Sequence, residues 1–226
     1  MRFRNLLLWD MKFQARYGFY LLYGLLTVFY LMLLFALPLS WKENTAAILI
    51  YSDPAAMGLF FMGAIILLEK SQRVTAFFAV SPLKVFEYVC SKVLSLSAIA
   101  LLVALVLAAA VKCRFLPYLL LGTFLSSILF TLLGMIIATK ITSLNQFILA
   151  TVPVEMVVFV PAVLHLFRIT PAAMGSYPAN VCMDLILGRD FSVVGLCLTI
   201  GLIALLFWAA CQCVWSMWQN QGGIKL

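Results

Sequence analysis

The chain has 226 residues, of which 65% are hydrophobic and only 10% are charged. Soluble domains carry about 25% charged residues, so this composition excludes a chain whose whole surface faces water. The formal net charge of +7 fits the basic cytoplasmic segments of a membrane protein better than a nucleic-acid-binding surface. Apolar runs of membrane-spanning length, without period-two alternation, predict an all-α membrane protein.

The first third of the chain predicts one interfacial helix and two spans. Residues 1–16 mix four basic side chains with leucine, phenylalanine and tryptophan, which is typical of a helix lying on the membrane surface. The first span is expected at 17–39. Asp53 is a favourable N-cap and Pro54 suits the first helical position, so the second span is expected at 54–72.

Four further apolar runs complete six predicted spans in one transmembrane domain. They cover residues 88–111, 117–139, 144–166 and 191–218. Between the last two, turn residues precede the apolar stretch "ANVCMDLILG", which is too short to cross a bilayer. Irregular backbone at membrane depth is tolerated only where protein or a water-lined cavity covers it, so we expect a short re-entrant helix on the extracellular side.

Six spans place both termini on one side of the membrane, and the positive charges predict which side. With the termini inside, ten lysine and arginine residues lie in interior segments and five in exterior segments. This excess favours cytosolic termini in a protein of the plasma membrane. The interior set is Arg2, Arg4, Lys12, Arg16, Lys70, Arg73, Lys84, Lys92, Lys140 and Lys225; the exterior set is Lys42, Lys112, Arg114, Arg168 and Arg189.

The largest interior segment is "EKSQRVTAFFAVSPLKVFEY", between the second and third spans. Glu69 and Arg73 are four residues apart, so the second span is expected to continue into the cytosol as a helix. Ser81 and Pro82 are expected at the N-cap and first position of the next helix. The segment should therefore be a helical extension, a short tip and a new helix.

Phe77 and Phe78 form the apolar tip of this segment. The tip could lie on the lipid headgroups, or it could insert into a groove of a partner protein. A desolvated aromatic anchor contributes much of the binding energy of an interface, so the partner interpretation is favoured.

Catalytic motifs are absent from the sequence. Neither G-x-x-x-x-G-K-[ST] nor H-E-x-x-H occurs, and His165 is the only histidine. Intramembrane hydrolysis usually needs paired acids, a metal cluster or a Ser/His arrangement, and one acid near the middle of a span supplies none of these. We therefore expect no catalytic residue, no metal site and no cofactor in this chain, which is not predicted to be an enzyme.

Two features within the spans are candidates for a substrate pathway. Glu155 is an ionisable group in the fifth span, where it marks either a pathway or a protonated side chain bonded to a neighbouring helix. In the first span, Tyr20, Tyr23 and Tyr30 share one helix face. That face could line a pore or a dimer seam, although ordinary packing between helices is the favoured interpretation.

The segments "LLLWDMKFQARYGFYLLYGLL" and "DPAAMGLFFMGAIILLEKSQRVTAFFAVSPLKVFEYVCSKVLS" carry a family resemblance. With the chain length and the order of elements, they resemble the membrane subunits of type-2 ABC exporters, and more closely the permease subunits of fluoroquinolone export. The resemblance implies a half-transporter that pairs with a second permease copy or a homologous permease. It also implies two copies of a separate ATPase subunit, which bind ATP and Mg.

The same resemblance assigns the segment between the second and third spans to the region that couples a permease to its ATPase. The expected coupling residues are Glu69, Arg73, Phe77, Phe78, Ser81, Pro82 and Lys84. Because the spans offer few polar groups, the expected substrate is an amphipathic, drug-like or lipid-like molecule that is exported. The alternative is a non-transporting multi-pass subunit, such as an immunity, sensor or assembly protein.

Overall fold

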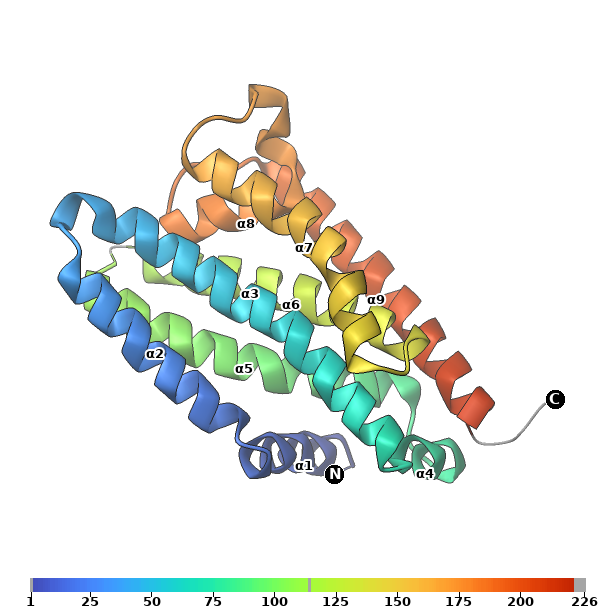
Figure 1. The fold of residues 1–226 in the computed structure, drawn as a ribbon. Coiled ribbons are helices and arrows are strands. Elements are labelled where there is room, and N and C mark those ends of the chain that lie inside the picture. The colour runs from blue at the N-terminus through green and yellow to red at the C-terminus, as the bar shows by residue number, and fades with distance from the viewer. Residues whose placement is uncertain (1, 114, 222–226) are drawn as a thin grey trace.

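A computed structural model describes residues 2–113 and 115–221, so Arg114 and Lys225 of the charge comparison lie outside the described residues. Every regular element in these ranges is a helix, which confirms the predicted all-α class. In chain order (Figure 1) the elements are α1 (Arg2–Arg16), α2 (Phe19–Ala36), α3 (Leu39–Ser71), α4 (Val74–Val80), α5 (Val85–Val111), α6 (Leu116–Lys140), α7 (Leu144–Leu166), the 3-10 helix η1 (Ala172–Ser176), α8 (Pro178–Leu187) and α9 (Val193–Gln221).

Six of these helices are long and apolar enough to cross a membrane, namely α2, α3, α5, α6, α7 and α9. The chain is therefore a multi-pass membrane protein with the predicted number of candidate spans. Helix α3 has 33 residues, which is about 50 Å at a rise of 1.5 Å per residue. This length exceeds a hydrocarbon core of about 30 Å, so α3 must tilt or project from the bilayer.

The helix of the second span begins earlier than the expected Asp53. Helix α3 starts at Leu39, after an extended Pro38, and its backbone runs helically through position 53, whose side chain lies outside the described part. Four side chains in the first half of α3 are buried: Ala46, Ala47, Ile50 and Tyr51. Such tertiary packing outweighs a local capping signal, and the helix continues through it.

Helix α5 also begins at a different residue from the predicted one. Ser81 ends α4 instead of beginning α5, and its Oγ donates a hydrogen bond to the Phe78 carbonyl oxygen at 3.0 Å. Lys84 is the N-cap of α5, and its backbone N–H donates to Glu87 Oε2 at 3.2 Å. A glutamate three residues after the cap satisfies a backbone donor that the helix leaves free, and this fixes the start of α5.

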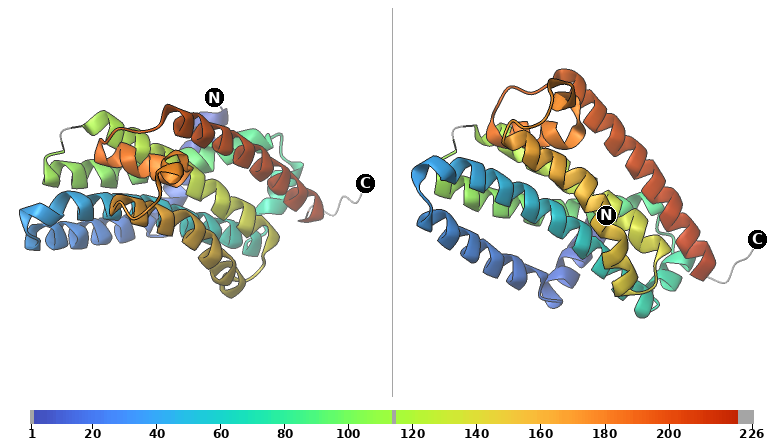
Figure 2. Two further views of the ribbon diagram at one scale, coloured as in Figure 1. Left: turned by 90° about the horizontal axis from the view of Figure 1, so that it is seen from above. Right: turned by 45° about the horizontal axis from the view of Figure 1, so that its top comes forward.

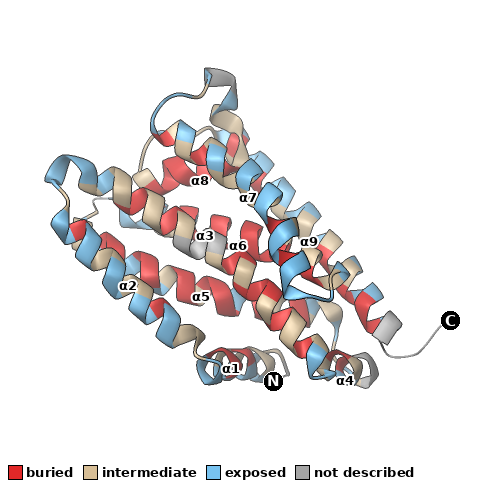
Figure 3. Ribbon diagram, viewed as in Figure 1, coloured by how far each residue is buried: buried red, intermediate tan, exposed pale blue. Residues whose placement is uncertain are grey.

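The bundle has a buried centre and three exposed outer helices. More than half of the spanning window is buried in α3, α5 and α6, against only 17% in α2, α7 and α9, as the colours of Figure 3 show. Helix α6 packs on α3, α5, α8 and α9. At Gly134 a Cβ atom would come within 2.5 Å of the Leu59 carbonyl oxygen, so α6 and α3 approach too closely for any larger residue.

The short helices gather at two ends of the bundle. Helices α1 and α4 lie at one end, here called the α4 end, where α4 packs on the last part of α9. Helix α8 lies toward the opposite end and packs on α3, α6, α7 and α9. Figure 2 shows α2 and α9 at opposite edges of the bundle, so both present long faces outward.

Candidate functional site

The corner between α3 and α4 is fixed by Lys70. Its Nζ donates hydrogen bonds to the carbonyl oxygens of Ala138, Thr139 and Ile141 at 2.7, 2.9 and 2.8 Å. The last carbonyl groups of a helix have no intrahelical partner, and a cation there also interacts favourably with the helix dipole. Lys70 thus joins the end of α3 to the end of α6. Arg73 then turns the chain into α4 with a left-handed backbone, φ 56°.

The two adjacent phenylalanines of α4 point to different surroundings. Phe78 is buried, and its ring lies 6.5 Å from Trp9, 5.6 Å from Tyr88 and 5.9 Å from Trp218 between ring centroids. Phe77 is 68% exposed. Phe78 therefore joins α4 to α1, α5 and α9, whereas the ring of Phe77 lies on the surface of α4.

A buried group of three charges lies beside this aromatic cluster and is called here the charge triad. Lys92 Nζ of α5 contacts Asp10 Oδ1 of α1 at 2.7 Å and also bonds Glu69 Oε1 of α3. All three side chains are at most 1% exposed. Ser91 Oγ donates to Asp10 Oδ2, and the Tyr88 hydroxyl donates to Glu69 Oε2 at 2.6 Å. Each carboxylate oxygen therefore accepts one hydrogen bond.

The charge triad holds three helices together at the α4 end. A single ammonium group neutralises one of the two carboxylates, and the rings of Trp9, Phe13 and Tyr88 lie 5.3 to 5.7 Å from Lys92 Nζ. Aromatic faces at this distance attract a cation. Removing one partner of a buried ion pair costs about 3–5 kcal/mol, because the other charge is left uncompensated. The triad therefore resists separation of α1, α3 and α5.

The predicted coupling residues fall into two groups. Glu69 belongs to the charge triad and Phe78 to the aromatic cluster, so neither lies on the surface. Arg73, Pro82 and Lys84 are exposed, as is Phe77, and Ser81 is half-buried. A surface hollow of about 360 Å³ beside α4 is lined by Asn5, Leu6, Phe77, Phe78, Ser81, Pro82 and Leu83. Of the exposed group, Phe77 and Pro82 line this hollow, together with Asn5 and Leu6 of α1.

The predicted pathway residues do not meet within one chain. Glu155 is half-buried on α7, and the tyrosines lie on α2, on the other side of α3 (Figure 1). Tyr23 is buried with its ring 5.0 Å from that of Phe61, which agrees with helix packing. Tyr20 and Tyr30 are half-buried.

A second polar cluster, which the sequence did not indicate, lies at the end opposite α4. His165 Nδ1 lies 2.8 Å from Thr170 Oγ1, and His165 Nε2 lies 3.0 Å from Asp184 Oδ2. Burial raises the pKa of the Asp184 carboxyl, although His165 and Arg189 act in the opposite direction. The cluster ties the last turn of α7 to α8. Within the described residues, no group of His, Cys, Asp or Glu side chains could hold a metal ion.

Six candidate spans around a buried centre, with a charge triad and an exposed aromatic corner at one end, define a multi-pass membrane protein. The sequence profile of the fluoroquinolones export permease protein family matches residues 1–220, so the chain belongs to this family. Two relatives from Mycobacterium tuberculosis are the fluoroquinolones export permease proteins Rv2687c (strain H37Rv) and MT2761 (strain CDC 1551). Each is 29% identical over 170 residues, which cover 74% of this chain and 71% of the relative.

Proposed function

We propose that this chain is the membrane subunit of an ATP-binding-cassette exporter and that a separate ATPase subunit docks on α4. The observation that carries the proposal is the position of Phe77, an exposed aromatic ring beside a buried one that is packed on three other helices. Exposed aromatic anchors contribute strongly to interfaces. Membership of an export permease family supports the direction of transport.

The contacts at the α4 end provide a route from the docking surface to the spans. A displacement of α4 would be transmitted to α5 and α9 through the contacts of Phe78. Helix α5 is in turn bonded to α1 and α3 through Lys92. ATP and Mg would be bound and consumed on the ATPase. Two permease copies and two ATPase copies complete the proposed exporter, with lipid and the second permease covering the exposed apolar faces of α2, α7 and α9.

The proposed orientation places the α4 end in the cytosol of a cell whose plasma membrane holds the spans. Both termini are then cytosolic, α1 lies at the interface, and α8 enters the membrane from outside as a re-entrant helix. The basic residues Lys70, Arg73 and Lys84 at the α4 end support this orientation through the excess of positive charge in cytoplasmic segments.

We propose an amphipathic, drug-like or lipid-like substrate. The printed names of the relatives specify fluoroquinolones for those proteins, and such molecules belong to the proposed class. Glu155, Tyr20 and Tyr30 remain the proposed pathway residues and would meet across two copies of the chain, whereas the buried Tyr23 packs against Phe61 within one copy. A non-transporting subunit is the alternative, and it predicts no ATPase partner.

Phe77→Asp tests the docking surface. Because Phe77 is exposed, the charge is not buried within the chain, and the fold should be unaffected, whereas copurification of the ATPase should be lost. A buried aromatic anchor contributes about 2 kcal/mol or more to an interface, which is roughly a thirty-fold loss of affinity. Phe167→Asp is the matched control, since Phe167 is 51% exposed and lies after α7, at the end opposite α4. Equal ATPase yields for both variants at equal expression would refute the docking role.

A further inference from the structure

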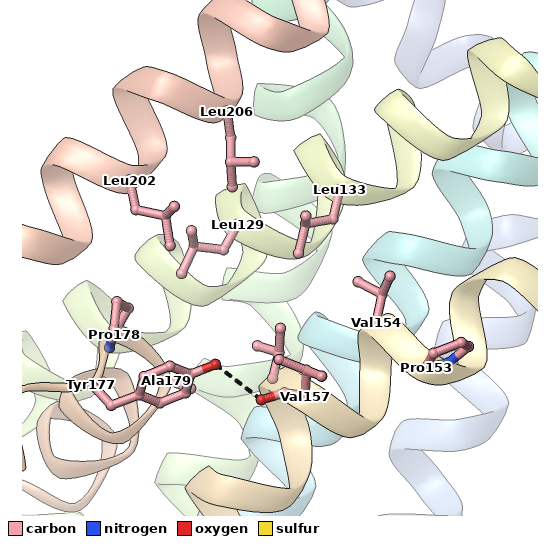
Figure 4. Close-up of a pocket in the computed structure, with 11 residues that line it drawn as sticks. Leu129, Leu133, Pro153, Val154, Val157, Tyr177, Pro178, Ala179, Leu202 and Leu206 are labelled. Atoms are coloured by element: carbon pink, nitrogen blue, oxygen red, sulfur yellow. Dashed lines mark hydrogen bonds between the residues drawn. The ribbon is translucent and has the colours of Figure 1, made fainter. Parts of the chain in front are cut away.

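An apolar cavity of about 300 Å³ lies between α6, α7, α8 and α9. Figure 4 shows Leu202 and Leu206 of α9 on one side of the space and Val154 of α7 on the other, with Leu129 and Leu133 of α6 between them in this view. The cavity is near the middle of these three spans. Its volume is at the lower end of the range of about 300–1,000 Å³ that is usual for small-molecule sites.

The cavity opens between two helices that face outward. Helices α7 and α9 both pack on α6 and α8, but they are not among the helix pairs that pack closely on each other. Both have spanning windows that are mostly exposed. Val157, which lines the cavity, is 63% exposed. At this depth the surrounding medium is lipid hydrocarbon, so the opening connects the cavity to the bilayer interior.

The hydroxyl of Tyr177 and the carbonyl oxygen of Val157, which both border the cavity, are hydrogen-bonded to each other. Pro161 has no backbone N–H, so the carbonyl oxygen of Val157, four residues earlier, loses its helical partner. The hydroxyl of Tyr177 donates a hydrogen bond to that oxygen at 3.0 Å, as Figure 4 shows. Tyr177 supplies the one polar side chain among the lining residues. A ligand with charged or hydrogen-bonding groups would have to bury them unpaired, which is costly, whereas a hydrocarbon chain has none.

We infer that this cavity binds the acyl chain of a bilayer lipid. The chain enters sideways between α7 and α9, lies on the leucines of α6, and ends against Tyr177 and Pro178. Binding needs neither an ATPase nor transport. Its test on the isolated chain therefore fails or succeeds independently of the proposed exporter function.

The test uses the full chain in vesicles of phosphatidylethanolamine and phosphatidylglycerol that contain a trace of phosphatidylcholine with a diazirine in mid-chain. After irradiation, mass spectrometry compares adducts on the cavity segments 129–133, 153–158 and 202–206 with adducts on the exposed face of α2, for example at Leu21 and Leu25. The expected result is enrichment at the cavity segments over α2. Equal labelling would show ordinary annular lipid and would overturn the inference, as would protection of the cavity by a second copy of the chain.

Filling the cavity provides the matched comparison. Leu202→Trp and Leu206→Trp place a larger ring in the opening, and Leu205→Trp places the same ring one residue away on the outward face of α9. Trp208 is 66% exposed in the natural chain, so this helix already tolerates an outward tryptophan. The two filled variants should lose the enrichment and Leu205→Trp should keep it. Retained enrichment in the filled variants, or the same loss in Leu205→Trp, would contradict the inference.

If a filled variant does not fold, a lipid competition experiment on the unmutated chain tests whether the cavity binds an acyl chain. Unlabelled lipid with straight chains should displace the enriched label, whereas lipid with methyl-branched chains is bulkier and should displace it less. Equal displacement by both lipids would show that the labelled position does not select chain shape, and the inference would fall.

Discussion

Replacing Lys92 by methionine should destabilise the fold strongly. The change keeps an unbranched apolar side chain and removes the ammonium group, so Asp10 Oδ1 and Glu69 Oε1 both lose their donor. These two carboxylate oxygens are then left without a hydrogen-bond donor, and both side chains are no more than 1% exposed. The expected loss is about 3–5 kcal/mol in the free energy of unfolding, the usual cost of breaking a buried ion pair.

The neutral triple variant Asp10→Asn, Glu69→Gln, Lys92→Met should recover part of that loss. No buried charge is then left unpaired, and the new amide oxygens can still accept from Ser91 and Tyr88. The recovery is partial because each amide N–H group faces the methionine without an acceptor. Lys84→Met is the matched control, because Lys84 is exposed, and exposed substitutions usually change stability by less than about 0.5 kcal/mol.

Unfolding of the four proteins by sodium dodecyl sulfate in mixed micelles, followed by tryptophan fluorescence, provides the measurement. The predicted order of midpoints is wild type and Lys84→Met highest, the triple variant intermediate, and Lys92→Met lowest. A Lys92→Met midpoint equal to wild type would refute the electrostatic role of the charge triad. A triple variant no better than Lys92→Met would show that packing, and not unpaired charge, accounts for the loss.

Three further predictions concern topology, the pathway and pH. A cysteine at Lys84 should react with a membrane-impermeant thiol reagent only from the cytosolic side in a cysteine-free background; labelling from outside intact cells would reverse the proposed orientation. Glu155→Gln should change transport or its pH dependence without unfolding the protein, and normal transport at every pH would make Glu155 a structural residue. Burial raises the pKa of the Asp184 carboxyl, so the folded chain binds the carboxyl proton more tightly than the unfolded chain. The free energy of unfolding should therefore fall as pH rises above the usual aspartate pKa of about 3.9. Asp184→Asn should lose this part of the pH dependence in thermal unfolding scans; an unchanged slope would exclude Asp184 as its source.

The number of spans was predictable because it depends on local composition. A run of apolar residues long enough to cross a bilayer is visible without knowing its neighbours, and all six appear as helices. The boundaries depend on contacts that composition does not contain. Asp53 looks like an N-cap in isolation, yet burial of Ala46 and Ile50 extends α3 back to Leu39.

The charge triad was not predicted because its members are far apart in the sequence. From the sequence, Lys92 was counted among the interior charges and Glu69 was paired with Arg73, whereas Asp10 was given no partner. In the structure Arg73 leaves the helix with a positive φ, and Glu69 turns toward Lys92. The local pairing rule fails because it assumes that both residues are helical.

A signal for the triad was nevertheless present in the third span. Tyr88, Ser91, Lys92 and Ser95 follow helical spacing, so their side chains form a polar stripe on one face of α5. Asp10 and Gln14 are four residues apart on α1, and Gln14 Nε2 donates to Ser95 Oγ at 2.8 Å. Buried polar side chains need hydrogen-bond partners, so the polar stripe of α5 could have been matched with the polar residues of α1.

Lys70 makes α3 and α6 a single mechanical unit. For α3 to slide along α6, three bonds to one ammonium would have to break together, and the contact of Gly134 with Leu59 leaves no room for sliding further along. If α4 is displaced, we therefore expect both central helices to move together. Helix α7 follows α6 after three residues, 141–143, so its first turn is displaced with them. We therefore expect the contacts of Lys70 to influence the position of α7, which forms one wall of the cavity.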